Sequence, residues 1–500
     1  MNFAKITPTD EKTPSLTIDE DVLQVEDIKK RSMNGAISYV LRSLFLQGIG
    51  VLSYFLLSAL LSTGDFGIYG IVVSISSFFT IISDIGLAAS LIQKKEAPTI
   101  RDLRTVFTVQ QILAWVVCLL IIATAWSLHL SGRLELPAVF LAGAFALSFP
   151  IVSLKTISSI LLERQLEFGK LAMPAVVEAI VFNGIVLFFA WRGMGITSYS
   201  IAVLARAIVG VIIMLSIKRW PVGFAFSKPA FSDLMKVGIK FQANDVIAKI
   251  KDELFTVITV FLLSKSELGY ITWANQASRL PYRFGVDSVM AITFPTFARL
   301  QHDAHLLKRA IEKTLFFVSL AVFPLLAGFA VMFIPLTSLI PKYAQWQPAL
   351  LTLGFMCVSI AFSSISTPLI NTLNAIGKIN TSLRFMLIWT LLQWTLTPLA
   401  IWRFGFNGVA IASVIISFTV IFVVRALQRE VQFAFVEQIW RQLVASLCMA
   451  VFLFQFIPLW SQSFLLFCAG VLSGGLLFIG LLALLGFEKI RGELLSLVRR

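Results

Sequence analysis

The chain has 500 residues, a formal net charge of +14, 58% hydrophobic residues and a mean hydropathy of +0.87. This composition is too apolar for a soluble protein of several domains, and apolar stretches of about 18–25 residues, long enough to span a membrane as helices, recur along the chain. The basic residues lie in short loops between these stretches, where such residues set membrane topology, so the charge does not indicate a nucleic-acid partner. We therefore expect an all-α polytopic membrane protein.

The first 31 residues are polar, with an acidic cluster at residues 19–27 and three basic residues at 29–31. They lack the basic region followed directly by an apolar region that marks a cleaved signal peptide. We expect a disordered cytoplasmic tail.

Fourteen candidate spans follow the tail. They cover residues 34–61, 66–92, 106–128, 136–154, 172–190, 196–216, 236–263, 274–298, 312–334, 347–370, 383–402, 407–424, 442–460 and 464–485. With the N-terminus inside, the cytoplasmic segments hold several basic residues each, whereas an outer loop never holds more than one of Arg133, Arg192, Lys265, Lys342 and Arg403. This alternation predicts that both termini are cytoplasmic.

An internal repeat relates the two halves of the chain. The matching pairs are Leu60–Gly67 with Leu262–Gly269, Gly169-Lys170 with Gly377-Lys378, and Gly195 and Ala202 with Gly405 and Ala412. Copies of six spans share one orientation, so we expect two lobes related by an axis along the membrane normal, around a central cavity. The predicted parts are a tail (1–31), an N-lobe (32–216), a cytoplasmic linker (217–235), a C-lobe (236–426) and a C-terminal helix pair with a cytoplasmic end (427–500).

Charged residues inside the predicted spans gather in spans 7 and 8. Asp245, Lys249 and Asp252 share one helical face in span 7, and Arg279 and Arg283 share a face in span 8. An ionised side chain near the bilayer centre costs about 2.5–3.5 kcal/mol on insertion scales, so such groups usually face a protein interior or a wet cavity.

The repeat extends this charged region to the N-lobe. Asp84 in span 2 aligns almost opposite Asp287 in span 8, and Arg42 in span 1 aligns with the Asn244–Asp245 pair in span 7. Both predicted lobes therefore contribute charge to the central cavity.

No motif for a catalyst or a metal centre is present in the sequence. There is no G-x-x-x-x-G-K-[ST] loop, and His302 and His305 lack a third ligand nearby. The four cysteines lie in apolar runs, where we expect them to be buried. We expect no enzymatic activity, no cofactor and no metal.

A charged cavity between two similar lobes is typical of a secondary transporter. Arg42, Lys249, Arg279 and Arg283 are candidates to bind an anionic headgroup such as a diphosphate, because guanidinium groups pair bidentately with phosphate oxygens. Asp84, Glu178, Asp245, Asp252 and Asp287 are candidates to neutralise these bases or to carry a coupling proton or sodium ion. A structural alternative is that Arg42 snorkels to the cytoplasmic face and that 249–253 forms an internal ion-pair ladder.

Several motifs carry a resemblance to a known family. These are Asn34-Gly35-Ala36, the turn Leu61–Tyr69, the segment Asp84–Gln93, the segment Leu268–Ala277 and the segment Asn371–Ile379. Together they resemble the Wzx-type polysaccharide flippases of the multidrug/oligosaccharidyl-lipid/polysaccharide export superfamily. The resemblance implies transport of an undecaprenyl-diphosphate-linked oligosaccharide across the bacterial inner membrane, by alternating access, for surface or exopolysaccharide biosynthesis.

The partners implied are the lipid-linked oligosaccharide, a coupling proton or sodium ion, and a polymerase or other polysaccharide-assembly proteins. Two alternatives stay within the superfamily: a multidrug or organic-cation antiporter, and a lipid II flippase. A membrane-embedded polymerase or ligase is disfavoured because the predicted outer loops are short.

Overall fold

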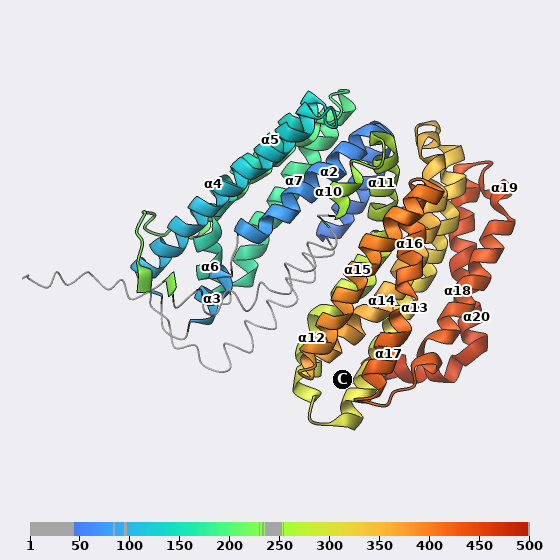
Figure 1. Ribbon diagram of the computed structural model, residues 1–500. Coiled ribbons are helices and arrows are strands. Elements are labelled where there is room, and N and C mark those ends of the chain that lie inside the picture. The colour runs from blue at the N-terminus through green and yellow to red at the C-terminus, as the bar shows by residue number, and fades with distance from the viewer. Residues whose placement is uncertain are drawn as a thin grey trace, which may run out of the picture.

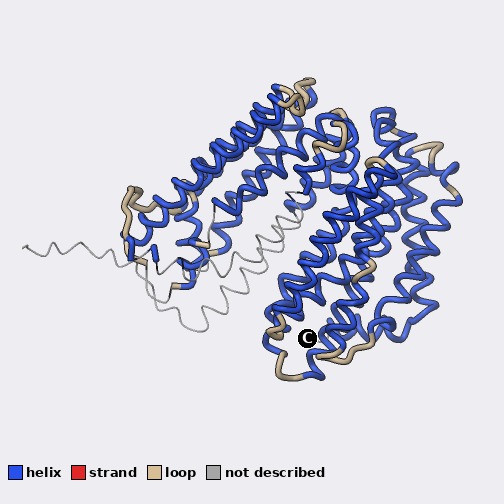
Figure 2. Tube along the Cα trace, viewed as in Figure 1, coloured by secondary structure: helices blue, strands red, loops and turns tan. Residues whose placement is uncertain are grey.

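The computed structural model describes residues 45–83, 86–94, 98–165, 167–229, 231–232, 235, 253 and 255–498. Within these ranges the chain forms helices and loops and no β-strand (Figure 2). Ten of the described helices are long and apolar enough to cross a membrane. The predicted all-α, multi-pass fold is therefore confirmed. The count of fourteen spans stays a prediction, because much of the first and seventh predicted spans lies outside the described residues.

Two groups of helices form the N-lobe and the C-lobe, which come together at one end and diverge toward the other (Figure 1). The N-lobe contains a helix at Phe45–Leu60, α2 (Thr63–Ser83), α3 (Leu87–Gln93), α4 (Ile100–Leu130), α5 (Leu136–Ser153), α6 (Thr156–Arg164), α7 (Phe168–Trp191) and α8 (Thr197–Ile217). The C-lobe contains α10 (Phe255–Thr259), α11 (Lys265–Tyr282), η2 (Arg283–Asp287), α12 (Ser288–Leu300), α13 (Ala304–Leu339), η3 (Pro341–Ala349), α14 (Leu350–Ala375), α15 (Ile379–Phe404), α16 (Asn407–Ser417) and α17 (Val420–Gln428). A C-terminal pair, α18 (Phe435–Gln455) and α20 (Phe464–Val498), is joined by α19 (Ile457–Trp460) and packs against α13.

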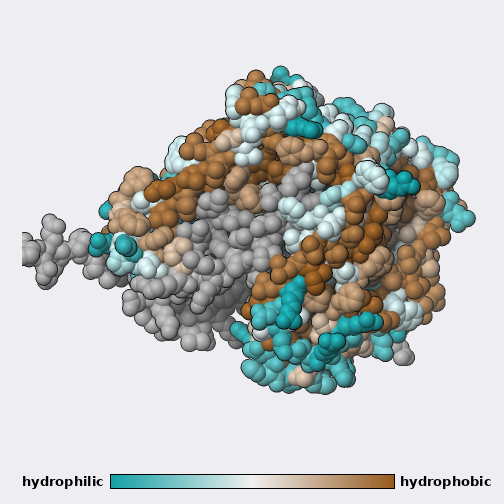
Figure 3. Space-filling model, in the orientation of Figure 1, coloured by the Kyte–Doolittle hydropathy of each residue, from teal (hydrophilic) through white to brown (hydrophobic). Residues whose placement is uncertain are grey.

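The flanks of the molecule are hydrophobic, and its hydrophilic residues gather at the ends of the helices (Figure 3). Large apolar side chains such as Trp402 and Leu484 are exposed. In water such surfaces would aggregate, so they indicate contact with lipid. Two of the four cysteines, Cys448 and Cys468, are also exposed, so the prediction that all four are buried is wrong for this pair.

The internal repeat is visible in how α2 and α11 begin. Ser62 and Asp65 form reciprocal hydrogen bonds that cap α2, with Asp65 N–H donating to Ser62 Oγ (3.2 Å) and Ser62 N–H donating to Asp65 Oδ2 (3.1 Å). Ser264 and Glu267 form the same capping box at the start of α11. Such a box satisfies backbone N–H groups that a helix leaves without partners at its first turn.

Two glycines at equivalent repeat positions let the lobes touch. A Cβ atom on Gly67 of α2 would lie 2.1 Å from the carbonyl oxygen of Lys265, and a Cβ atom on Gly269 of α11 would lie 1.8 Å from the carbonyl oxygen of Thr63. Neither contact leaves room for a side chain, so each glycine permits the backbone of the opposite helix to approach. The α2–α11 contact thus forms the centre of the interface between the lobes.

We call the end where the lobes meet the closed end. There the indole Nε1–H of Trp346 donates to the carbonyl oxygen of Ser58 (2.8 Å), and the hydroxyl of Tyr343 donates to that of Phe55 (2.6 Å). Trp273 stacks on Trp346 with 4.9 Å between ring centroids. Aromatic residues of the C-lobe therefore hold the end of the first described N-lobe helix.

Two further contacts bridge the lobes at the closed end. Glu135, at the start of α5, forms an ion pair with Lys265, at the start of α11. The guanidinium of Arg133 lies over the ring of Phe261, 5.7 Å from its centroid. We call these four residues the closed-end bridge.

Helix boundaries differ from the predicted spans where the backbone kinks. The predicted span 66–92 is interrupted, since α2 ends at Ser83 and α3 begins after Gly86, whose φ of 79° is left-handed. The segment at 219–227 has no regular secondary structure and lies along α4, with Ala225 N–H donating to Thr108 Oγ1 (3.1 Å). It connects to the N-lobe by side chains as well, because Trp220 packs against Phe107.

Candidate functional site

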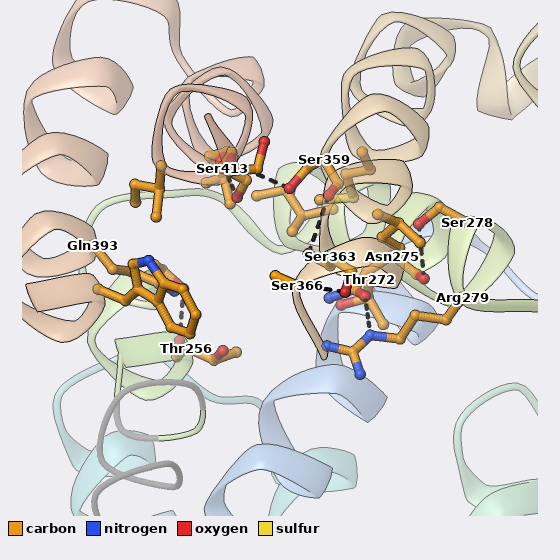
Figure 4. A pocket seen from close by; sticks show the side chains of 18 of the residues that line it. Thr256, Thr272, Asn275, Ser278, Arg279, Ser359, Ser363, Ser366, Gln393 and Ser413 are labelled. Carbon is orange, nitrogen blue, oxygen red and sulfur yellow. Dashed lines mark hydrogen bonds between the residues drawn. The ribbon is translucent and has the colours of Figure 1, made fainter. Parts of the chain in front are cut away.

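A polar cavity of about 380 Å³ lies on the C-lobe side of the lobe interface. Helices α10, α11, α14, α15, α16 and α17 line it, and Gly67 and Ile71 of α2 contribute from the N-lobe. The polar lining is mainly hydroxyl and amide groups (Figure 4), including Thr272, Ser359, Ser363, Ser366, Ser413 and Gln393. Arg279 is the charged residue among the described lining residues.

Hydroxyl groups in the cavity wall donate to backbone carbonyls of their own bundle. Ser363 Oγ donates to the carbonyl of Ser359 (3.1 Å), and Ser359 Oγ donates to the carbonyl of Ser413 on α16 (3.1 Å). A hydroxyl that donates in this way keeps its oxygen lone pairs free to accept. The wall therefore offers acceptors from the serines, whereas amide and guanidinium groups supply donors.

Arg279 lies at the edge of the cavity, on the side away from Ser413 (Figure 4). Its Nε–H donates to Asn275 Oδ1 one helical turn earlier, at 2.7 Å, which fixes the side chain along α11. The residue is exposed, and no carboxylate among the side chains that the structure describes pairs with it. The positive charge of the Arg279 guanidinium is therefore not neutralised by those carboxylates.

A π-helical turn, η2, separates α11 from α12 and begins directly after Tyr282, the last residue of α11. Arg283 begins this turn and Asp287 ends it. A Cβ atom on Gly285 would lie 2.3 Å from Val322 Cγ2, so glycine allows the wider turn to pack on α13. π-Helical turns inside helices are frequent at functional sites, because they reorient the residues on either side. Arg283 is exposed.

The structure brings together two of the predicted site residues, Arg279 and Arg283, on one helical segment at the lobe interface. Arg42, Lys249, Asp84, Asp245 and Asp252 lie outside the described residues. The backbone of Asp287 is described and its side chain is not. The roles predicted for these residues stay predictions.

Glu178 lies in the N-lobe and pairs with bases that the sequence reasoning did not single out. It is 7% exposed, and it forms ion pairs with Lys155 and with Arg206, the latter at 3.5 Å between Oε2 and Nε. The available signal for Arg206 was its position in the middle of an apolar stretch, ten residues into the predicted span 196–216. Glu178 lies six residues into the preceding predicted span, 172–190.

A second, apolar cavity of about 600 Å³ lies between the N-lobe, α13 and the C-terminal helix pair. Phe55 lines it from the N-lobe, Phe329 and Phe333 from α13, and Met449 and Phe467 from the C-terminal pair. It has no charged residue among its described lining residues, so it suits a hydrocarbon chain. In the part of the chain that the structure covers, no group of three or more histidine, cysteine, aspartate or glutamate residues is placed to hold a metal ion.

Solved structures with the same fold are membrane transporters. The inward closed conformation of the lipid II flippase MurJ matches with a TM-score of 0.69 and 14% identity, over 91% of this chain and 100% of that one. An inward-facing multidrug resistance MATE family transporter matches with a TM-score of 0.57 and 16% identity, over 79% of this chain and 98% of that one. At these identities the likeness shows the shared fold.

Sequence comparison identifies the family. The chain is 22% identical over 379 residues to the lipopolysaccharide biosynthesis protein WzxC of Escherichia coli (strain K12), covering 73% of this chain and 74% of that protein. It is 23% identical over 326 residues to the succinoglycan biosynthesis transport protein ExoT of Rhizobium meliloti (strain 1021), covering 65% of each. These relatives confirm the resemblance drawn from the sequence motifs. Because the model of the family described as polysaccharide biosynthesis protein matches residues 56–350, more than half of the chain, this protein belongs to that family.

Proposed function

We propose that this protein translocates undecaprenyl-diphosphate-linked oligosaccharide repeat units across the bacterial inner membrane, from the cytoplasmic to the outer leaflet, for surface or exopolysaccharide biosynthesis. The observation that carries the proposal is the hydroxyl-lined cavity at the lobe interface, with the Arg279 guanidinium at its edge. No covalent bond is made or broken in this step, so the protein acts as a transporter and not as an enzyme.

The chemistry of the cavity matches the polar part of such a lipid. Sugar hydroxyls both donate and accept hydrogen bonds, and the serine oxygens and the Gln393 amide offer complementary groups. A diphosphate requires cationic partners, which Arg279 and Arg283 supply as charge-assisted hydrogen-bond donors. Without such a path, moving the headgroup through hydrocarbon would leave its polar groups without partners, at a cost of several kcal/mol each.

The apolar cavity is our candidate for the prenyl chain. Its aromatic and methionine side chains present surface that a hydrocarbon chain can cover without loss of hydrogen bonds. It lies beside helix Phe45–Leu60, which also contacts the C-lobe at the closed end. In this arrangement the tail stays in an apolar environment while the headgroup occupies the polar cavity.

The distribution of basic residues supports an orientation for the closed end. The loops at the closed end hold Arg133 and Lys265, and they belong to the predicted outer loops, which have at most one basic residue each. The loops at the opposite ends of the helices are rich in lysine and arginine, as cytoplasmic loops usually are. We propose that the closed end faces outward and that both termini are cytoplasmic. The lobes then diverge toward the cytoplasm, the side on which the substrate is made.

The multidrug antiporter alternative is less consistent with the cavity. A site for organic cations needs a carboxylate or an aromatic cage, and the described lining residues of the polar cavity include no carboxylate and one large aromatic residue, Trp389. Asp84, Asp245, Asp252 and Asp287 remain our candidates for charge balance or for a coupling proton or sodium ion.

A deletion strain tests the proposal. We expect loss of the surface polymer and accumulation of the lipid-linked repeat unit in the inner leaflet, both reversed by the wild-type gene. Normal polymer export with no accumulated intermediate would show that the proposal is wrong. Two further measurements separate the alternatives: altered susceptibility to cationic drugs would favour an antiporter, and accumulation of lipid II with cell lysis would favour a lipid II flippase.

A further inference from the structure

Three charged side chains form a cluster in the N-lobe, and none of them is among the described lining residues of the polar cavity. Glu178 on α7 pairs with Lys155, at the α5–α6 junction, and with Arg206 on α8. Glu178 and Arg206 lie in the middle of helices long enough to cross the membrane. Charges at such a depth are costly, and those that occur usually have a function or a structural partner.

Gly210 on α8 leaves room for the Glu178 carboxylate. A Cβ atom on Gly210 would lie 2.1 Å from Glu178 Oε1, so the absence of a side chain there lets the carboxylate reach the α8 backbone. Lys155, whose side chain is 17% exposed, forms the shorter of the two ion pairs and can by itself balance the charge of Glu178. Two cations thus share one carboxylate, which leaves a surplus positive charge on this part of the N-lobe.

Of the two cations that pair with Glu178, Arg206 is the more exposed. Its side chain is 55% exposed, although it contacts Glu178 and lies over the Phe182 ring at 5.8 Å. These two contacts restrict its position but occupy only part of the guanidinium, which has five N–H donors. A side chain that is fixed at one edge and open at the other is suited to bind an anion.

Aromatic residues connect α8, the helix that carries Arg206, with the lobe interface. Tyr199 lies two turns before Arg206 on α8, and it stacks on Tyr69 of α2 with 4.1 Å between ring centroids. The residue after Tyr69, Gly70, packs against Thr272 of α11, a residue that lines the polar cavity.

We propose that Arg206, positioned by Glu178 and Gly210, is a substrate-binding residue of the N-lobe that contacts the diphosphate opposite Arg279 and Arg283 of the C-lobe. This inference rests on the function proposed above. With cationic donors on both lobes, the diphosphate bridges them, and a change in the angle between the lobes alters the distance between the donors. Binding is then strongest in one conformation and weaker in the other, as net transport requires.

Binding of farnesyl diphosphate to the purified full-length protein tests the proposal, with farnesol as the probe that has the same chain and no phosphates. Arg206→Ala should weaken farnesyl diphosphate binding about tenfold, the effect of one lost charge-assisted contact, and should leave farnesol binding unchanged. Arg206→Lys should lose less, because it keeps the charge but not the bidentate geometry. Arg192→Ala, which removes an exposed arginine that lies over Phe188 and Trp191, is the matched control and should bind like the wild type.

Gly210→Ala tests the positioning separately, because it displaces the Glu178 carboxylate without changing any charge. We expect weaker diphosphate binding with the same elution profile on size exclusion. Wild-type affinity in Arg206→Ala, while Arg279→Ala is impaired, would overturn the role of Arg206 and leave the proposed function standing. No diphosphate-dependent binding by the wild type, together with normal polymer export in the deletion strain, would overturn the proposed function itself.

Discussion

Arg279 and Arg283 are one turn apart, and their guanidinium groups are exposed at the lobe interface. We expect Arg279→Ala and Arg283→Ala each to reduce polymer export in the deletion strain by about tenfold or more, because a hydrogen bond to a charged group contributes about 1.5–3 kcal/mol. The measurement is the rate of polymer appearance at the cell surface at equal protein level in the membrane. Arg403→Ala, which removes an exposed arginine at the end of α15, is the control. Full export by both cavity variants would remove these residues from the mechanism.

A second prediction concerns Gly67, where α2 contacts α11. Gly67→Ala would place a methyl group 2.1 Å from the Lys265 carbonyl oxygen, and a backbone atom cannot move away without separating α2 from α11. We expect a loss of about 1–3 kcal/mol, the usual cost of overpacking, seen as a lower apparent melting temperature in detergent. Gly64→Ala is the matched control on the same helix, because its nearest neighbour would be Ser62 Oγ at 3.8 Å. Equal melting temperatures for the two variants would contradict this account of the interface.

Helices α2 and α11 begin with the same capping box, so the equivalent Ser→Ala substitution can be tested at both helix starts. Ser62→Ala and Ser264→Ala each remove the side chain that accepts from the third residue of the helix, at a cost of about 1 kcal/mol. Hydrogen exchange followed by mass spectrometry should show faster exchange in the first turn of the affected helix and not in its repeat partner. Ser→Thr at the same positions retains the cap and should exchange like the wild type. Unchanged exchange in both alanine variants would mean that the boxes do not stabilise the helix starts.

The helices could be predicted from the sequence because membrane spans and their internal repeat leave local sequence patterns. Apolar length predicted the helical class, and the match of Leu60–Gly67 with Leu262–Gly269 predicted the two equivalent helix starts, which the structure shows with the same cap. The kink at Gly86 and the π-helical turn at Arg283–Asp287 left no such pattern, since both depend on how neighbouring helices pack. The association of Arg206 with Glu178 was hidden for the same reason: it arises from the contact between α7 and α8.

At the scale of the whole molecule, the closed-end bridge connects loops of the two lobes. Exposed ion pairs and cation–π contacts contribute about 1 kcal/mol or less each, so the bridge can bias the lobe arrangement without locking it. We expect Glu135→Gln with Lys265→Met to raise the population in which the closed end opens by up to about fivefold. The charge-swapped pair Glu135→Lys with Lys265→Glu should restore the wild-type distribution.

Distances between spin labels at Leu136 and Leu262, which are exposed in the two lobes, measure this distribution. The exposed Cys448 and Cys468 are first replaced by serine so that labelling is restricted to the introduced sites. Identical distance distributions in the wild type and the double variant would mean that the bridge carries no conformational bias.

The reciprocal approach of Gly67 and Gly269 also bears on the origin of the protein. Each glycine faces the backbone of the other's helix, as the same residue would in two identical subunits meeting on a twofold axis. A single six-helix ancestor that paired with itself through this glycine, and whose gene was later duplicated and fused, would account for the arrangement. On this account, fusion would allow the two copies to diverge, which fits the present difference between them: the C-lobe contributes the serine-rich cavity and the N-lobe the Lys155–Glu178–Arg206 cluster.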